Sequence, residues 1–353
     1  MVKRDLASVL TEKKIIFAEI KILIMEEQSL YPLKFMPLFK DKIWGGNKIK
    51  DIVGIDYSPL ERCGELWVLS GVEEDETLVA NGYLAECTLS EIIDMYTDEL
   101  MGENNYNEFG EHFPLLLKII DAKEKLSVQV HPDDKIAQSK GMDNGKTEMW
   151  YVMQADEGAE IISGFNKKMT KAEVVNRLRD NNIAEVLNTE TTEKGDLFYI
   201  PAGQIHAIGS GVLLAEIQQS SDSTYRVYDW DRVDDNGKPR DLHRAEAIEA
   251  LDLNYVGPSA KSGYNYAINK TVELVECQYF TTNIIHLSEG LIKDYSDLDS
   301  FVIYFCVEGS GLIDSLGHRI PLRAGEAMLI PAIAGKTTIE PNGLIKILEI
   351  YIQ

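Results

Sequence analysis

Four residues in strand-like contexts carry side chains that could bind a metal ion: Gln129, His131, Glu148 and His206. Residues 127–131 read Ser-Val-Gln-Val-His, and alternate side chains of a strand share a face, so Gln129 and His131 point the same way. Two neutral imidazoles, a carboxylate and an amide oxygen suit a borderline divalent ion such as Zn²⁺ and leave room for a water or substrate oxygen. The combination favours a metal site over ordinary polar residues near strand ends.

The composition argues against two classes of partner. The chain has 353 residues, with 35 Lys and Arg against 58 Asp and Glu. Nucleic acid and anionic membranes both require a basic face, so neither is expected, and an anionic small substrate would need a local cationic pocket. The length predicts two domains. The four cysteines lie far apart without a C-x-x-C pair, which indicates a reducing cytoplasm and neither a zinc knuckle nor a disulfide framework.

The first residues need separate treatment. Residues 1–4 are partly basic and residues 15–25 are fairly apolar, but Glu19 and Lys21 interrupt that apolar run. The run is also too short to span a bilayer, so neither a signal peptide nor a transmembrane helix is expected. We predict that residues 1–29 form an N-terminal extension.

An internal repeat divides the rest of the chain. Residues 195–203 and 325–333 each have a Gly-acid pair, an apolar strand and Ile-Pro-Ala, at an offset of 130 residues. A second apolar strand lies upstream of each copy, at residues 148–153 and 301–306. Short strands punctuated by Gly and Pro are typical of β-barrels or sandwiches. The sequence therefore predicts two related β units.

Only the first unit keeps the ligand types. The repeat places Phe301 opposite Glu148, and Lys336 opposite His206. We therefore expect the chemistry in the first unit and a structural or substrate-shaping role for the second.

Helical periodicity is confined to short segments, at residues 89–100, 133–141 and 170–181. Thr170 and Glu173 form a capping box that predicts a helix start. These segments are interpreted as helical insertions on a β scaffold. A structural role is expected for the remaining histidines, which are His112, His243, His286 and His318.

The order of several motifs resembles the type I mannose-6-phosphate isomerases, in their short bacterial form. The motifs span nearly everything after residue 30 and are Lys42-Ile-Trp-Gly-Gly46, Gly64-Glu-Leu-Trp67, Phe113-Pro-Leu-Leu-Leu-Lys118, Leu126-Ser-Val-Gln-Val-His-Pro-Asp133, Lys146-Thr-Glu148, Ile200-Pro-Ala-Gly-Gln-Ile-His206 and Ser223-Thr-Tyr-Arg-Val-Tyr-Asp-Trp-Asp-Arg232. Any one of these motifs would be a weak signal, whereas seven in the expected order are specific. The first 29 residues depart from the usual short form.

The resemblance implies a fold and a division of the chain. The family has the cupin fold, so we expect a mainly β protein with two cupin-like β-barrels, a bicupin, and short helical insertions. The catalytic barrel would span residues 30–254, and a second barrel without metal ligands would span residues 255–353.

The resemblance also implies the site and the reaction. In this family the residues that match Gln129, His131, Glu148 and His206 bind zinc, one ion per chain, and the arginine that matches Arg226 lies in the active site. The expected reaction interconverts mannose 6-phosphate and fructose 6-phosphate in the cytoplasm.

The reaction moves a proton between C1 and C2 of a phosphorylated hexose through a cis-enediol. A divalent ion would act as Lewis acid, and Arg226 could hold either the enediolate or the phosphate, unless it is a surface arginine paired with Asp229 or Asp231. Lys125 and Ser127 are expected to contact substrate if the strand extends that far. Further cations beside the site are Lys146, a candidate for substrate binding, and Arg232.

Three questions stay open at this point. The catalytic base could be a metal-bound water, Glu216 or a lysine. The chain could instead be a sugar-phosphate-binding cupin without turnover, or an Fe²⁺ cupin oxygenase built on two histidines and a carboxylate, although Gln129 and the cations argue against the oxygenase. The sequence does not indicate the oligomeric state.

Overall fold

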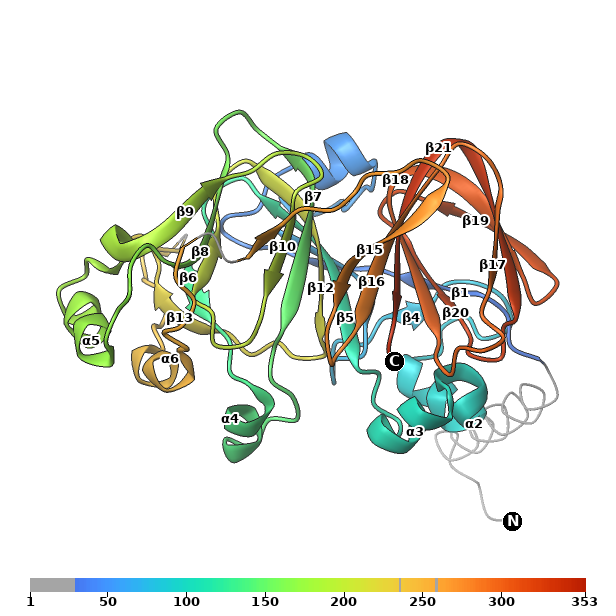
Figure 1. Ribbon diagram of the computed structural model, residues 1–353, viewed down its shortest axis with the longest axis horizontal. Helices are drawn as coiled ribbons and strands as arrows, with labels where there is room; N and C mark the ends of the chain where they lie inside the picture. The colour runs from blue at the N-terminus through green and yellow to red at the C-terminus, as the bar shows by residue number, and fades with distance from the viewer. Residues whose placement is uncertain (1–28, 235, 258–259) are drawn as a thin grey trace, which may run out of the picture.

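The structure is a computed structural model that describes residues 29–234, 236–257 and 260–353. Apart from Ser29, the predicted N-terminal extension lies outside the described residues. The described chain is mainly β, as expected, and its strands form three sheets that lie side by side along the long axis of the molecule (Figure 1). In the described part of the chain, no helix combines the length and apolar character needed to cross a bilayer.

The first two sheets belong to one lobe. The seven-stranded sheet has the order β14 (Lys261–Ser262), β10 (Leu197–Ile200), β7 (Glu148–Ala155), β12 (Val212–Gln219), β5 (Leu115–Ala122), β3 (Glu65–Ser70) and β2 (Leu38–Lys40). The five-stranded sheet has the order β13 (Tyr225–Tyr228), β6 (Val128–Val130), β11 (His206–Ile208), β8 (Glu160–Phe165) and β9 (Leu187–Thr191). An apolar cluster that includes Trp150, Ile161 and Ile208 fills the space between the two sheets.

The third sheet forms the other lobe. It follows the order β15 (Lys270–Glu276), β16 (Thr281–Leu287), β21 (Lys336–Tyr351), β18 (Val302–Ser315), β20 (Ala327–Ile330), β1 (Leu33–Met36) and β4 (Leu78–Val79), with β17 (Leu291–Asp294) on β21 and β19 (His318–Arg323) on β18. Strands β1 and β4 come from the first part of the chain, so the two lobes are interleaved in sequence. The division at residue 254 stays a prediction.

A shared core joins the lobes. One face of the seven-stranded sheet, including Leu117 and Met149, packs in the same cluster as Phe280, Phe305 and Leu348 of the third sheet. The opposite face of that sheet turns toward the five-stranded sheet. Because neighbouring strand residues point to opposite faces, each interior strand contributes to both cores.

The predicted pair of closed barrels is not confirmed, because the strand order of each sheet is an open path. Strands β6 and β11 have three residues each, and the hydrogen-bonded ladders end within their own sheet. The first lobe is therefore two open sheets that face each other over a common core.

The helices lie on the outside of the sheets (Figure 1). They are η1 (Ile49–Val53), α2 (Leu89–Met101), α3 (Glu103–Phe109), α4 (Asp134–Ser139), α5 (Lys171–Arg179), η2 (Ile183–Val186) and α6 (Arg244–Ala250). All three predicted helical segments are present, as α2, α4 and α5. The predicted capping box is confirmed, since Thr170 and Glu173 exchange both capping hydrogen bonds at the start of α5.

The internal repeat is visible in the strand register. Ile200 pairs with Glu148, and Ile330, 130 residues later, pairs with Val302. Val302, and not the predicted Phe301, therefore takes the place of Glu148, because sequence similarity located the strand but not its register. Lys336 begins β21 as His206 begins β11. The third sheet thus carries valine and lysine where the first lobe has ligand types.

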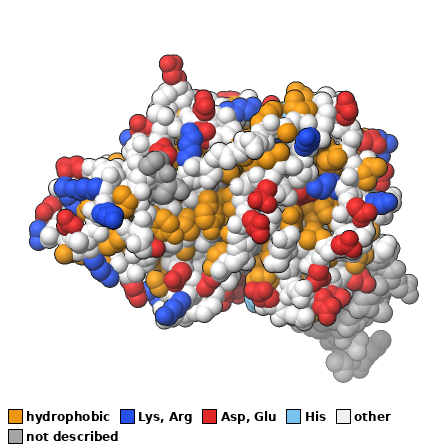
Figure 2. Space-filling view, viewed as in Figure 1, with side chains coloured by type: hydrophobic (Ala, Val, Ile, Leu, Met, Phe, Trp, Pro, Cys, Tyr) orange, Lys and Arg blue, Asp and Glu red, His pale blue; other side chains and the backbone are white. Residues whose placement is uncertain are grey.

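The charge of the surface follows the composition. The formal net charge is −23, and acidic side chains are spread across the face shown in Figure 2. Any recognition of an anion must therefore rely on a local group of cations rather than on the field of the whole molecule.

Candidate active site

One row of polar side chains lines the inner face of the five-stranded sheet. Gln129 on β6 pairs with His206 on β11 and with Arg226 on β13, so the three residues stand in a row across the strands. Their apolar neighbours, such as Val130 and Val227, point outward into a core with residues of α5 and α6. The alternation of each short strand therefore directs all three polar side chains to the inner face.

A second row lines the seven-stranded sheet opposite. Glu216 on β12 pairs with Trp150 on β7 and with Lys118 on β5, and Glu148 begins β7 two residues before Trp150. Leu117 and Met149, on the other face, pack in the core shared with the third sheet. The charged residues of these strands therefore face the polar row of the five-stranded sheet.

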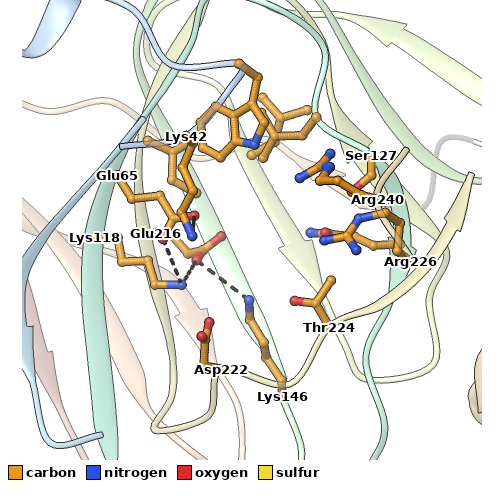
Figure 3. Close-up of a pocket in the computed structure, with 15 residues that line it drawn as sticks. Lys42, Glu65, Lys118, Ser127, Lys146, Glu216, Asp222, Thr224, Arg226 and Arg240 are labelled. Atoms are coloured by element: carbon orange, nitrogen blue, oxygen red, sulfur yellow. Dashed lines mark ion pairs between the residues drawn. The ribbon is translucent and has the colours of Figure 1, made fainter. Parts of the chain in front are cut away.

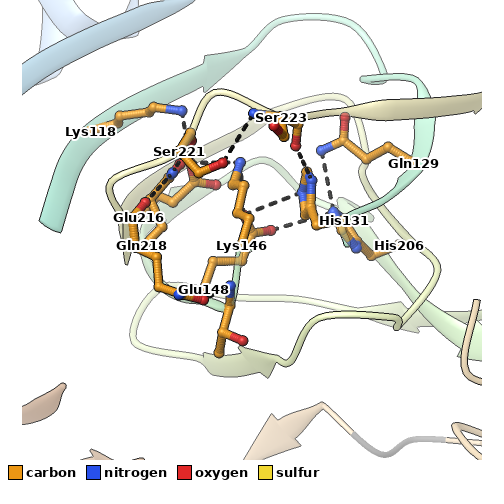
Figure 4. A network of polar contacts seen from close by, with 12 residues as sticks. Lys118, Gln129, His131, Lys146, Glu148, His206, Glu216, Gln218, Ser221 and Ser223 are labelled. Atoms are coloured by element: carbon orange, nitrogen blue, oxygen red, sulfur yellow. Dashed lines mark hydrogen bonds and ion pairs between the residues drawn. The ribbon is translucent and has the colours of Figure 1, made fainter. Parts of the chain in front are cut away.

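The two rows meet at a candidate metal site formed by His131, Glu148 and His206, whose candidate ligand atoms all lie within 4.8 Å of one another. Glu148 Oε2 lies 3.5 Å from His131 Nε2, and Glu148 Oε1 lies 3.4 Å from His206 Nε2. All three side chains are buried, with relative exposures of at most 1%. Figure 4 shows the carboxylate turned toward both imidazoles.

Backbone carbonyls fix the tautomer of each imidazole. His131 Nδ1 lies 2.8 Å from the Ser223 carbonyl, and His206 Nδ1 lies 2.8 Å from that of Gln204. Because a carbonyl only accepts, each Nδ1 carries the proton and donates, which leaves the Nε2 lone pair directed at Glu148. Burial lowers the pKa of His206 to about 4 and holds that of His131 below its usual value. Both rings are therefore neutral near pH 7, as metal binding requires.

The donor set fits a divalent cation. His131 Nε2 and Glu148 Oε1 accept no hydrogen bond from any residue that the structure describes. Burial and the nearby Glu216 carboxylate raise the pKa of Glu148 to about 7. Buried acceptor atoms that face one another are unfavourable unless a cation or a donor lies between them, and two imidazoles with a carboxylate are ligands typical of zinc.

Gln129 lies beside this site with its amide turned the other way from the prediction. Its Nε2, and not its oxygen, lies 3.2 Å from His206 Nε2. A half turn of the amide exchanges the two atoms and would bring the predicted oxygen donor to the same place. Gln129 as fourth ligand stays a prediction.

A cavity of about 250 Å³ adjoins the metal site. Gln129, which contacts His206, and Lys146, which contacts Glu148, both line it. The charged lining residues are Lys42, Glu65, Lys118, Lys146, Glu216, Asp222, Arg226 and Arg240. In Figure 3 their side chains converge from the two facing sheets and the connecting loops. Cations outnumber carboxylates here, in a protein whose net charge is −23.

A buried chain of charges crosses the floor of the cavity. Lys146 Nζ lies 3.0 Å from Glu148 Oε2 and 3.8 Å from Glu216 Oε1, and Lys118 Nζ lies 3.3 Å from the same Glu216 oxygen. Trp150 Nε1 donates to the other Glu216 oxygen at 2.8 Å. Burial alone would raise the pKa of Glu216, but Lys146 and Lys118 hold it below its usual value. Glu216 is therefore ionised near pH 7.

Arg226 faces the cavity and is not the surface ion pair that the sequence left possible. Its Nη1 donates to the Asp241 carbonyl at 2.9 Å. Asp229 instead binds Arg232 and Arg240, each with a shortest distance of 2.6 Å. Arg226 thus keeps donor capacity for a ligand in the cavity.

The structure brings most of the predicted substrate contacts together, but not Lys125. Ser127, Lys146 and Arg226 line the cavity, whereas Lys125 does not and lies over the Trp230 ring, 5.1 Å from its centroid. The prediction for Lys125 assumed that the strand extends to it, but β6 begins at Val128. Arg232 also lies outside the cavity lining, bound to Asp229 and to the Lys125 carbonyl.

Sequence reasoning missed Lys42, Glu65, Lys118 and Arg240. Lys118 had a visible signal, because a lysine within the buried strand Leu115–Ala122 requires a partner. Glu65 and Lys42 lie in matched family motifs but were given no role. Arg240 lies in a polar loop that carries no strand pattern, and only the fold directs it to the cavity.

Comparison with known proteins identifies the family. Residues 32–163 match phosphomannose isomerase type I, catalytic domain, and residues 270–351 match mannose-6-phosphate isomerase, cupin domain. The chain is 37% identical over 313 residues to mannose-6-phosphate isomerase ManA of Bacillus subtilis, covering 88% of this chain and 96% of that protein. The chain belongs to the type I mannose-6-phosphate isomerase family.

Further relatives agree with this assignment. Mannose-6-phosphate isomerase of Streptococcus mutans is 37% identical over 300 residues, which is 85% of this chain and 92% of that protein. The crystal structure of the mannose 6-phosphate isomerase from Bacillus subtilis matches with a TM-score of 0.82 at 34% identity, over 92% of this chain and all of that one. Variant structures of phosphomannose isomerase from Salmonella typhimurium, at 16% identity and a TM-score of 0.73, share the fold.

Replacing one imidazole tests the metal site. We expect His206→Ala to lose bound divalent metal, because two protein donors and an optional amide bind far more weakly than three. The metal content of purified protein, measured by mass spectrometry, checks this result, and circular dichroism checks that the β fold remains. His112→Ala, at an exposed histidine, serves as the control and should keep its metal. Equal metal content in both variants would contradict the assignment.

Proposed function

We propose that the chain is an isomerase that interconverts mannose 6-phosphate and fructose 6-phosphate in the cytoplasm. The observation that carries the proposal is the position of His131, Glu148 and His206 beside a cation-rich cavity in a chain of this family. A phosphorylated hexose needs both parts, because its phosphate is an anion and its reacting carbons need electrostatic stabilisation of oxygen charge. The proposal keeps the two-barrel interpretation of the fold and the division at residue 254.

The metal of the proposed site is zinc, one ion per chain, held by Gln129, His131, Glu148 and His206. When bound, it would supply Lewis-acid stabilisation of negative charge on the sugar oxygens. The donor types support zinc, since imidazole and carboxylate ligands in a tetrahedral or five-coordinate set suit this ion.

The protein residues move the proton. Isomerisation removes a proton from one of C1 and C2 and returns it to the other through a cis-enediol. We assign the base to Glu216, because it is a carboxylate that lines the cavity and lies beside two ammonium groups that keep it ionised. Trp150 holds one Glu216 oxygen, which leaves Oε1 on the side of Lys118 and Lys146. Lys146 can then stabilise charge on Glu216 and on the substrate oxygens during the transfer.

The cations on the cavity wall bind the substrate. Arg226 presents a rigid donor fork that matches a phosphate or an enediolate, and Ser127 adds a hydroxyl beside it. Burial and the neighbouring Arg240 lower the pKa of Arg226, but the group stays charged at any working pH. Two adjacent guanidinium groups repel each other, so binding an anion between them relieves that repulsion.

A coupled assay of mannose 6-phosphate conversion tests the proposed reaction. We expect activity that is lost after chelation and restored by added zinc, since the carboxylate and imidazoles bind the metal reversibly. Chelated protein with magnesium added instead is the control and should stay inactive. Binding of mannose 6-phosphate without turnover at any metal loading would replace the isomerase with a sugar-phosphate-binding protein.

The assigned base is tested by Glu216→Gln, which keeps the shape and removes the charge. We expect kcat to fall by about 100-fold or more with the metal content unchanged, because general base catalysis is lost while the metal-binding side chains remain. Steady-state kinetics and metal analysis of the same sample check both parts. A variant with near-normal kcat would move the base to another group.

Arg226→Ala should also keep the metal and lose turnover, because the side chain contacts the ligand cavity and not the metal ligands' donor atoms. The expected loss in kcat/KM is roughly 100-fold, the range for removing a charged donor from a reacting or binding oxyanion. Kinetics on mannose 6-phosphate measure it, with Arg319→Ala, an exposed arginine of β19, as the control. Loss of metal in Arg226→Ala would instead indicate a structural role.

A further inference from the structure

The third sheet reaches the active-site lobe through the tip of one hairpin. Strands β15 and β16 are joined by residues 277–280, and the Tyr279 hydroxyl at this tip donates to Asp134 Oδ2 at 2.6 Å. Asp134 is the first residue of α4, in the loop region that follows the metal ligand candidate His131. A residue of the lobe without ligand types is thus hydrogen-bonded three residues away from the site.

Asp134 passes this contact on to the segment that carries Lys146. Its other oxygen, Oδ1, accepts hydrogen bonds from the Gly145 amide at 2.8 Å and from Gln219 Nε2 at 2.9 Å. Gln219 in turn accepts from the Thr147 amide at 2.8 Å. The peptide groups on both sides of Lys146 are therefore held by one hydrogen-bonded cluster that begins at Tyr279.

The same segment has no free space in which to adjust. The Lys146 amide donates to the Pro132 carbonyl at 3.0 Å, and Gly145 packs against the backbone of residues 132–134. A Cβ atom at Gly145 would lie 2.5 Å from the Asp133 carbonyl carbon, closer than real contacts allow. Movement of Asp134 must therefore move the 145–147 backbone with it.

The position of this backbone decides where the Lys146 ammonium lies. Lys146 is buried, with 4% of its surface exposed, and its Nζ lies between Glu148 and Glu216. Figure 4 shows the lysine reaching from this segment into the polar network. Groups that stabilise charge in a transition state lose much of their effect when displaced by as little as about 1 Å.

We propose that Tyr279 is a positioning residue that acts through Asp134 to hold Lys146 in its catalytic place. The third sheet thereby contributes to the reaction without touching the substrate. This inference rests on the proposed function for its kinetic consequence, but the hydrogen-bonded path from Tyr279 to the 145–147 amides exists whatever the substrate is.

The first test removes one hydroxyl. Tyr279→Phe should lower kcat for mannose 6-phosphate by roughly tenfold, the range for losing a hydrogen bond to a charged group, with KM within about twofold. Tyr83→Phe is the matched control, because Tyr83 is also partly buried and its hydroxyl bonds Ser29 and Tyr96 instead. Equal kcat in the two variants, or a loss confined to KM, would overturn the proposal.

A double variant tests the route. If Tyr279 acts through Asp134, adding Tyr279→Phe to Asp134→Ala should leave kcat as in Asp134→Ala alone, whereas independent effects would multiply and overturn the route. Asp134→Asn should retain more activity than Asp134→Ala, because its amide oxygen can still accept from the Gly145 amide.

Hydrogen exchange separates this inference from the proposed function. In Tyr279→Phe, the amides of residues 145–147 should exchange faster than in the wild type and in Tyr83→Phe, whether or not the protein turns over mannose 6-phosphate. An inactive wild type with this change in exchange would refute the reaction and keep the positioning contact. Unchanged exchange in Tyr279→Phe would refute the positioning contact, even with a fully active wild type.

Discussion

The buried carboxylate of Glu148 is the group on which the arrangement of the site depends. It begins a strand of one sheet and faces the imidazoles of His131 and His206 at 3.4–3.5 Å, in a space closed to solvent. A charged carboxylate is costly to bury without a partner, so its surroundings must supply positive charge. Lys146 supplies one part, and the geometry of the two imidazoles indicates a cation as the other.

This requirement explains why two sheets must face each other. A single strand can direct alternate residues to one side, as β6 does with Gln129, but it cannot place a carboxylate opposite its own side chains. The carboxylate and the lysines come from the seven-stranded sheet and its loops, whereas His206 and Arg226 come from the five-stranded sheet. The core between the sheets therefore sets the spacing of the site, and the core behind the seven-stranded sheet ties that spacing to the third sheet.

The strand pattern was sufficient to predict residues whose position depends on local alternation. The metal ligand candidates fall in or beside short strands or at strand starts, and the structure brings His131, Glu148 and His206 together as predicted. The same reasoning was wrong for Lys125, because the alternation was extended past the start of β6. Where a strand begins depends on pairing with β11 and β13, which the local sequence does not encode.

Other features depended on contacts between distant segments. Repeat similarity located the strand opposite Glu148 in the second half, but the register of β18 placed Val302 there and not Phe301. Arg240 reaches the cavity from a loop that Asp229 holds through its carboxylate, 11 residues away in sequence. Such placements follow from tertiary hydrogen bonds and have no periodic signature for a sequence to show.

The spacing of Lys146 and Glu148 links binding to catalysis. Two residues apart at the start of a strand, they point to the same side, and the ammonium lies 3.0 Å from the carboxylate. A shift of this segment by one residue would turn both side chains away from the cavity at once, removing a candidate metal ligand and a catalytic cation together. Firm anchoring of residues 145–147 therefore protects two functions with one set of hydrogen bonds, and it gives the third sheet, which lacks ligand types, a physical reason to contact the first lobe at Asp134.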